Sequence, residues 1–354
     1  MIPRKWLGGH MQKSLKYEPA LDGIRGVAVL TVMASHWLPD LLPGGWLAVD
    51  TFFVLSGYLI TRLLLDEFAR DNQINLVRFY TGRAVRLMPA FWCLLAFMLA
   101  VIVVAHHRQA MIHSWIMSAT YLMNWNIALR WGSADYLGHT WSLAAQEQFY
   151  ILWPVAFLFI RGKRPLVWIG VAIAAAVAWR FHLVQHQATE QRLYDGFDTH
   201  ADPLLMGCAM AFPKVSEGLR AVLSRLRFAW IAVVAIMFAW LFIPPESVQM
   251  LGVTLAGLLA MAFITLATQG TLRQLLVQKP LVFTGRISYA LYLWHYPLLG
   301  LVANRMPGTS PLVALIAAYL VAVLSYFTVE KYFRHLKRKY RPVGYAPQVA
   351  EAVS

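Results

Sequence analysis

The chain has 354 residues, of which 59% are hydrophobic and only 14% are charged, and its formal net charge is +14. A soluble domain usually carries about 25% charged residues, so this composition excludes an ordinary water-soluble globular protein. The apolar residues fall in runs near the ~20 residues that a helix needs to cross a bilayer, and no stretch between the runs is long enough for a separate soluble core. We therefore expect an all-α, polytopic transmembrane helix bundle.

Taken in chain order, about ten apolar runs have the length expected of membrane spans. They cover residues 21–39, 46–66, 87–105, 140–160, 165–183, 200–213, 228–243, 248–269, 286–304 and 311–330. A further run, 112–128, is short and is interrupted by Asn124 and Asn126. The expected organisation is a cytoplasmic segment (1–20), a transmembrane domain (21–333) and a cytoplasmic tail (334–354).

The positions of the basic residues predict the orientation of the bundle, because Lys and Arg are enriched in cytoplasmic loops. With ten spans and a cytoplasmic N-terminus, most of the 31 lysines and arginines lie on the inner side. The outer segments then hold only Arg108, Arg130, Arg180, Arg192 and Arg305. Counting 112–128 as a span would move every later basic cluster outside, so we interpret it as an interfacial or re-entrant segment on the outer face. Both termini are then cytoplasmic, and the positive charge indicates topology rather than nucleic-acid binding.

Two ionisable residues in the first span are candidates for function, since a charge at the centre of a spanning helix costs about 2.5–3.5 kcal/mol. Arg25 and His36 lie close to three helical turns apart, which places them on one face and about 16 Å from each other along the axis. Asp22 precedes Arg25 by one turn and could pair with it. In the predicted orientation, Arg25 is near the cytoplasmic end and His36 is in the outer half.

Arg83 and Arg86 open the third span, and their spacing puts both guanidinium groups on one helix face. Such a fork suits phosphate or pyrophosphate, although anchoring beside phospholipid headgroups explains the same spacing. Glu147 enters the fourth span from the outer side, at a depth close to that of His36. The two could form a catalytic dyad in which the carboxylate orients the imidazole, or a purely structural hydrogen bond between packed helices.

Other polar and aromatic residues lie at or near the outer ends of the spans. Asp50 opens the second span and Asp202 the sixth, with His200 beside it, and all three fit simple interfacial positions, His200 most clearly. Trp141 could stack on a sugar, although an interfacial aromatic belt explains most of the tryptophans. His295, deeper in the ninth span, is interpreted as a packed core residue. The sequence shows no HExxH, CxxC, P-loop or GxSxG spacing, so it predicts no metal site.

These residues occur within a set of motifs that resembles the acyltransferase-3 family of integral-membrane O-acyltransferases, in its stand-alone form without an appended esterase-like domain. The motifs are LDGIRG (21–26) with His36, GWLAVDTFFVLSGYLI (45–60), FYTGRAVRLMPA (79–90), WSL (141–143) with EQFY (147–150), DPLLMG (202–207), GRISY (285–289) with LYLWH (291–295), and EK (330–331). They run in consistent order over residues 18–335. Gln146 stands where the family usually has a first glutamate, and Glu147 retains the second.

The resemblance implies transfer of an acyl group, most often acetyl, from cytoplasmic acyl-CoA to a hydroxyl of a glycan or lipid-linked sugar in the bacterial inner membrane. Acyl-CoA is then a donor substrate, and no permanently bound cofactor is expected. The expected ligands of its nucleotide end are Arg25, Arg83 and Arg86. His36, supported by Glu147, is expected to act as general base.

The residues expected to contact the acceptor are Asp50, Asp202 and Trp141. Two other functions remain open. A transporter or flippase for lipid-linked glycans or small anions uses intramembrane charges equally well. A non-catalytic scaffold would tolerate substitution of Arg25, His36 and Glu147, and neither alternative predicts acyl-CoA turnover.

Overall fold

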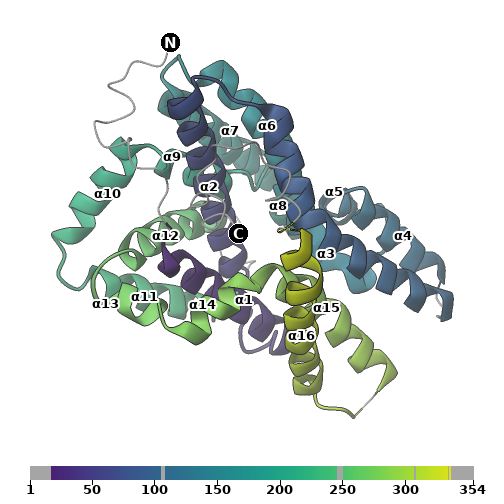
Figure 1. Ribbon diagram of the computed structural model, residues 1–354. Coiled ribbons are helices and arrows are strands. Elements are labelled where there is room, and N and C mark those ends of the chain that lie inside the picture. Colours follow the sequence, from purple (N-terminus) through teal and green to yellow (C-terminus); the bar gives the residue numbers. More distant parts are fainter. Residues whose placement is uncertain (1–16, 105–107, 245–249, 307, 334, 336–354) are drawn as a thin grey trace. The chain divides into compact units, whose positions relative to one another are not determined.

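The structure is a computed structural model that describes residues 17–104, 108–244, 250–306, 308–333 and 335 (Figure 1). All regular elements in these ranges are helical, and several are long and apolar, which confirms the predicted all-α, polytopic membrane fold. The predicted N-terminal segment 1–20 and tail 334–354 lie outside the described residues except for 17–20 and 335. The described residues form two compact units, the first within 17–74 and 148–285 and the second within 75–147 and 286–335.

Five helical segments in the described ranges are long and apolar enough to cross a membrane. They are α2 (Leu47–Asp71), α3 (Leu76–Val104), the 3-10 turn η2 (Asp135–Thr140) continued by α6 (Trp141–Ile160), α7 (Pro165–Gln185), and α16 (Pro311–Ser325) continued by the π-helical turn η4 (Tyr326–Glu330). Two bent pairs raise the number to seven if each pair is one span. They are α10 (Pro213–Ser224) with α11 (Ala229–Trp240), bent by 100°, and α12 (Gly252–Ala267) with α13 (Gly270–Leu276), bent by 89°.

By this measure the described helices give fewer spans than the roughly ten apolar runs of the sequence. The run 200–213 illustrates the difference, because it contains only the nine-residue helix α9 (Asp202–Met210), about 14 Å long. The run 228–243 contains α11, which has twelve residues. An apolar run indicates only that its residues are buried in lipid or protein. The length of a continuous helix depends instead on where the backbone turns, so an apolar run can contain a helix too short to span.

The run 112–128 is divided between two short helices, and the break falls at residues 120–122 rather than at Asn124 or Asn126, which lie inside the second helix. The two helices are α4 (Arg108–Ala119) and α5 (Met123–Ala128), separated by a turn in which Tyr121 has a φ of 54°. Asn126 is buried and its side-chain oxygen is 2.7 Å from His113 Nε2. A twelve-residue helix reaches about 18 Å, too short for a hydrocarbon core of about 30 Å. The segment is therefore not one continuous spanning helix.

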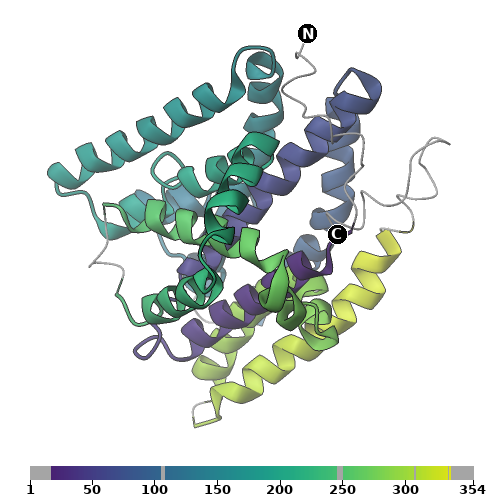
Figure 2. The same cartoon turned by 90° about the vertical axis from the view of Figure 1, so that its left-hand side faces the viewer.

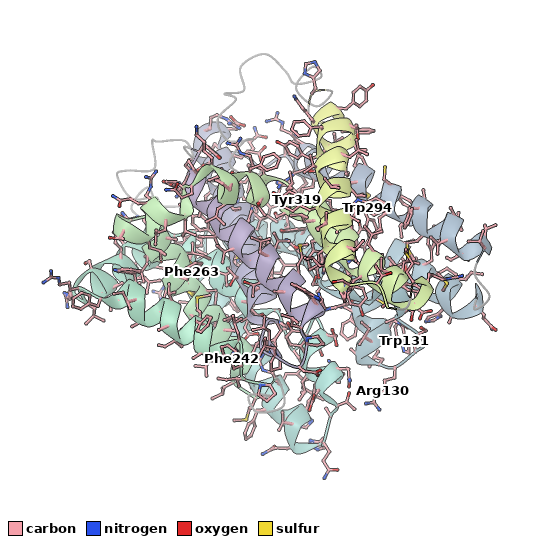
Figure 3. All side chains as sticks on the ribbon, turned by 90° about the horizontal axis from the view of Figure 1, so that it is seen from below. Arg130, Trp131, Phe242, Phe263, Trp294 and Tyr319 are labelled. Carbon is pink, nitrogen blue, oxygen red and sulfur yellow. The ribbon has the colours of Figure 1, made fainter. Side chains whose placement is uncertain are left out.

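The first unit is built around α2, which packs against α1 (Pro19–Trp37), α9 and α12 (Figure 1). Leu55 and Leu59 of α2 share an apolar core with Phe263 and Ile264 of α12, and Phe263 is labelled in Figure 3. The long helix α7 also packs against α9 (Figure 2), and α8 (Glu190–Asp195) lies between these two in the sequence. These neighbours enclose the buried face of α2.

Glycines determine how closely α2 and α9 cross. A Cβ atom at Gly57 would lie 1.9 Å from the Leu204 carbonyl oxygen, and one at Gly207 would lie 2.0 Å from the Val54 carbonyl oxygen. Crossings in which small residues let two backbones touch are a common way to pack membrane helices. Gly57 of the GWLAVDTFFVLSGYLI motif and Gly207 of the DPLLMG motif therefore have a packing role.

We expect Gly207→Ala to destabilise the purified protein by about 1–3 kcal/mol, the usual range for overpacking a tight core. The reason is that the added methyl group forces α2 and α9 apart. Gly170→Ala in α7 is the matched control, because nothing lies within 4 Å of the Cβ that it would add. The measurement is thermal unfolding in detergent, and equal midpoints for the two variants would contradict the prediction.

The second unit contains α3, α4, α5, η2, the start of α6, α15 (Ser288–Arg305) and α16. The helix α14 (Lys279–Arg286) leads from the first unit into α15. The helices α15 and α16 lie side by side, and Figure 3 labels Trp294 and Tyr319 on them. Tyr289 at the start of α15 donates a hydrogen bond to the Leu87 carbonyl oxygen at 3.0 Å, which fixes α15 against α3.

Candidate active site

Arg25 and Asp22 in α1 form the ion pair that their spacing predicted. Arg25 Nη1 donates to Asp22 Oδ1 at 3.3 Å, and the Tyr17 hydroxyl donates to Asp22 Oδ2 at 2.7 Å. Asp22 is buried, so both of its oxygens are satisfied within the fold. The pair fixes the guanidinium group of Arg25 near the N-terminal end of α1.

Glycines bring this end of α1 into backbone contact with α14. A Cβ at Gly285 would lie 1.7 Å from the Asp22 carbonyl oxygen, and one at Gly26 would lie 2.3 Å from the Leu281 carbonyl oxygen. The LDGIRG motif and the glycine of the GRISY motif are thus two sides of one contact within the first unit. This contact positions the turn of α1 that carries Arg25.

His36 lies in the last turn of α1 and is half-buried. Its ring is hydrogen-bonded to the Val32 carbonyl oxygen one turn earlier. His200 and His295 are both buried, with 1% and 0% of their surface exposed. His36 is thus the least buried of these three histidines.

Asp50 and His200 are paired in the interior of the first unit, which the sequence did not predict. His200 Nε2 is hydrogen-bonded to Asp50 Oδ1, and His200 Nδ1 to the Tyr194 carbonyl oxygen. Both ring nitrogens of His200 therefore have an oxygen partner, which fixes the ring within the fold. The side chain of His200 is fully buried in the fold, and its place at the membrane interface stays a prediction.

Asp202 is likewise buried, and its partner is Arg180 of α7. Arg180 Nη1 and Nη2 donate to Asp202 Oδ1 and Oδ2 at 3.2 and 2.8 Å. The remaining donors of the guanidinium group reach the Met250 carbonyl at 3.0 Å, the Thr199 carbonyl at 2.8 Å and Thr254 Oγ1 at 2.7 Å. The contacts of Asp50 and Asp202 lie within the fold, and their acceptor-binding role stays a prediction.

Arg180 is the residue that sequence reasoning missed. It was counted among the outer basic residues, whereas its side chain is 0% exposed. A signal was present, because Arg180 falls inside the predicted span 165–183, where a charged side chain demands a partner. Beside this network, burial raises the pKa of the Asp195 carboxyl to about 7, although the nearby His200 favours its charged form.

In the second unit, Glu147 accepts a hydrogen bond from Arg83 Nη2 at 3.1 Å. Both side chains are partly buried. Arg86 is half-buried three residues further along α3, as expected for two arginines on one helix face. The acid that the family motif retains is thus bound to the first arginine of the predicted phosphate fork.

Tyr289 extends this cluster, because it lies within electrostatic range of Arg83, Glu147 and Glu330. Glu330 is buried and ends the π-helical turn η4. Turns of this kind occur often at functional sites. The FYTGRAVR, EQFY, GRISY and EK motifs therefore meet around one partly buried group of charges.

The WSL and LYLWH motifs also meet in the second unit. The Tyr292 hydroxyl donates to the His139 carbonyl oxygen at 2.7 Å and lies 2.6 Å from Ser142 Oγ. Trp141, beside this link, is buried with 9% of its surface exposed.

His36 and Arg25 belong to the first unit, and Glu147, Arg83 and Arg86 to the second, so the His36–Glu147 dyad stays a prediction. Within the described ranges, no three His, Cys, Asp or Glu side chains gather as a metal site would require.

Comparisons with known proteins identify the family. A family model described as an acyltransferase domain matches residues 18–330. The chain is 31% identical to the O-acetyltransferase OatA of Staphylococcus aureus (strain NCTC 8325 / PS 47), over 95% of this chain and 60% of the relative. It is 31% identical to the peptidoglycan O-acetyltransferase OatA of Listeria monocytogenes, over 96% of this chain and 62% of the relative.

A third relative is the putative peptidoglycan O-acetyltransferase YrhL of Bacillus subtilis, 31% identical over 92% of this chain and 56% of the relative. The chain thus spans about 60% of the length of these relatives. No solved structure matches it. Because the family model covers nearly the whole described chain, and all the motifs above except the final Lys331, the chain belongs to the acyltransferase-3 family of membrane proteins.

Proposed function

We propose that this chain is an O-acyltransferase of the bacterial cytoplasmic membrane that moves an acetyl group from acetyl-CoA to a hydroxyl of a glycan. The observation that carries the proposal is the family match over residues 18–330, which contains every residue of the candidate site. The relatives named as peptidoglycan O-acetyltransferases support a glycan as acceptor. A lipid-linked sugar would present the same hydroxyl chemistry.

In the proposed reaction His36 is the general base. Its hydrogen bond to the Val32 carbonyl requires a proton on one ring nitrogen, which leaves a lone pair on the other nitrogen of the neutral ring. That nitrogen takes the proton of the acceptor hydroxyl as the hydroxyl oxygen attacks the thioester carbonyl. The carbon–sulfur bond then breaks, and the CoA thiolate takes the proton from the imidazolium. The products are the acetyl ester and CoA.

The proposed ligands of the CoA phosphates are Arg25, Arg83 and Arg86, because guanidinium groups bind phosphate bidentately. The Arg83–Glu147 bond supports a role for Glu147 in holding the Arg83 side chain in place. In the role predicted from the sequence, the same Glu147 carboxylate would instead orient the ring of His36. The two roles differ in kinetics, since loss of a phosphate contact raises KM and loss of support for the base lowers kcat.

The test is acetyl-CoA turnover by the purified full chain in nanodiscs, followed by release of the CoA thiol with and without peptidoglycan fragments. We expect Arg83→Gln to raise KM for acetyl-CoA by about 10- to 100-fold, because hydrogen bonds to charged groups contribute about 1.5–3 kcal/mol. Arg70→Gln is the control, since Arg70 pairs with Asp71 at the exposed end of α2. If Arg83→Gln left the KM for acetyl-CoA unchanged, the result would contradict phosphate binding by Arg83 and support anchoring of Arg83 and Arg86 beside lipid headgroups.

The acceptor is identified in cells with and without the protein, by mass spectrometry of muropeptides and surface glycans. We expect acetyl esters on sugars to disappear when the protein is absent. A purified chain that releases no thiol, together with unaltered glycans in the cells, would instead support the transporter.

A further inference from the structure

The helix α10 lies on the surface of the first unit, since none of its twelve residues is buried although it packs against α9 and α12. Its half-buried side, toward these helices, carries Val215, Leu219 and Leu223, which recur every four residues. Lys214 and Arg220 lie on another side and are exposed. Apolar residues on one side and charged residues on another make α10 an amphipathic helix.

The orientation of α10 follows from its angle to α11. Residues 225–228 join the two helices, which are bent by 100° relative to each other (Figure 1). Every residue of α11 is hydrophobic, and Ile231, Ile236 and Phe238 are exposed. Exposed apolar side chains in such number require lipid rather than water around α11. Because α11 runs into the bilayer, α10 runs close to the plane of the membrane surface.

Basic side chains are in excess on α10 and in the turn that follows it. Residues 213–228 contain four basic residues and one acidic residue, Glu217. Among them lie the apolar side chains of Val222, Leu226 and Phe228, which expose 57%, 61% and 61% of their surface. The four basic residues are all exposed, and within the described part of the chain none of them forms an ion pair: Lys214, Arg220, Arg225 and Arg227.

We propose that α10 and the turn 225–228 form an interfacial segment that binds anionic phospholipid. Its basic side chains contact the headgroup phosphates, and Val222, Leu226 and Phe228 enter the acyl-chain region. The argument is charge complementarity combined with apolar exposure. A neutral bilayer accepts the apolar side chains but leaves the four cations without counter-charges. A soluble acidic protein satisfies the cations but leaves the apolar side chains partly in water.

Lipid binding at α10 bears on the buried network of the first unit. The helix α10 follows α9 directly and packs against it, and α9 begins with Asp202, the partner of Arg180. Anionic lipid held at α10 therefore anchors the end of α9 at the membrane surface. This consequence does not depend on the proposed acyltransferase activity.

Hydrogen–deuterium exchange of the unsubstituted full chain tests the proposal, in nanodiscs of phosphatidylcholine alone and in nanodiscs that also contain phosphatidylglycerol. We expect phosphatidylglycerol to slow amide exchange in peptides from 213–228 about fivefold or more, because an anchored helix opens less often. Equal exchange in the two membranes would overturn the proposal. Protection in detergent that grows with protein concentration, without lipid, would assign this face to a second copy of the chain and overturn it as well.

A pair of double variants shows whether the cations of α10 are responsible. In detergent, Lys214→Gln with Arg220→Gln should need about 25-fold more phosphatidylglycerol for half of this protection, because each basic residue near an anionic surface contributes about a factor of five. Lys163→Gln with Arg164→Gln is the matched control, since it removes the same charge from exposed residues between α6 and α7. The control should protect 213–228 at the unsubstituted lipid concentration. Equal shifts in both double variants would mean that the general positive charge of the chain attracts the lipid, and the proposal would fail.

Discussion

His36→Ala is expected to reduce acetyl transfer by the purified chain by about 10²–10⁴-fold, the usual contribution of a general base. The reason is that no other group would then take the hydroxyl proton as the new ester bond forms. The effect should fall on kcat, with KM for acetyl-CoA little changed, because His36 is not a proposed phosphate ligand. The measurement is initial rate against acetyl-CoA concentration at saturating acceptor.

His186→Ala is the matched control for this experiment. His186 follows α7, is exposed, and its Nδ1 is hydrogen-bonded to the His182 carbonyl oxygen, the same four-residue pattern that His36 makes with Val32. It should keep the full rate. If His36→Ala transferred acetyl groups as fast as this control, the general-base mechanism would be refuted, whichever acceptor is used.

The second large effect is on stability. Arg180→Met is expected to destabilise the protein by about 3–5 kcal/mol, because it leaves the fully buried Asp202 without its positive partner. It also removes the donors to the Thr199 and Met250 carbonyls. The measurement is the midpoint of thermal unfolding in detergent, together with the yield of monodisperse protein.

Two comparisons make this prediction specific. Arg70→Met breaks an exposed pair with Asp71 and should cost at most about 1 kcal/mol. Adding Asp202→Asn to Arg180→Met should restore part of the lost stability, because the uncompensated charge is then gone. A single Arg180→Met variant as stable as Arg70→Met would mean that the buried pair contributes nothing.

Glu147 shows where prediction from the sequence stops. Its position in a span and its membership of a family motif were readable from the sequence, and so was the shared face of Arg83 and Arg86. Its hydrogen bond to Arg83 was not, because the two residues are separated by 64 positions and sequence depth alone pointed to His36. The depth of a charged residue in the membrane limits which residues can be its partner, but it does not determine which of them is.

The sequence by itself determined the all-helical membrane fold, the pairing of Asp22 with Arg25 and the interruption at 112–128. These features depend on hydrophobic run length and on three- or four-residue spacing, both of which are local. Only the tertiary structure decided that Asp50 binds His200 and that Arg180 binds Asp202. A buried charge must be paired, but the choice of partner follows from which helices pack together, and here glycines at the α2–α9 and α1–α14 contacts fix that packing.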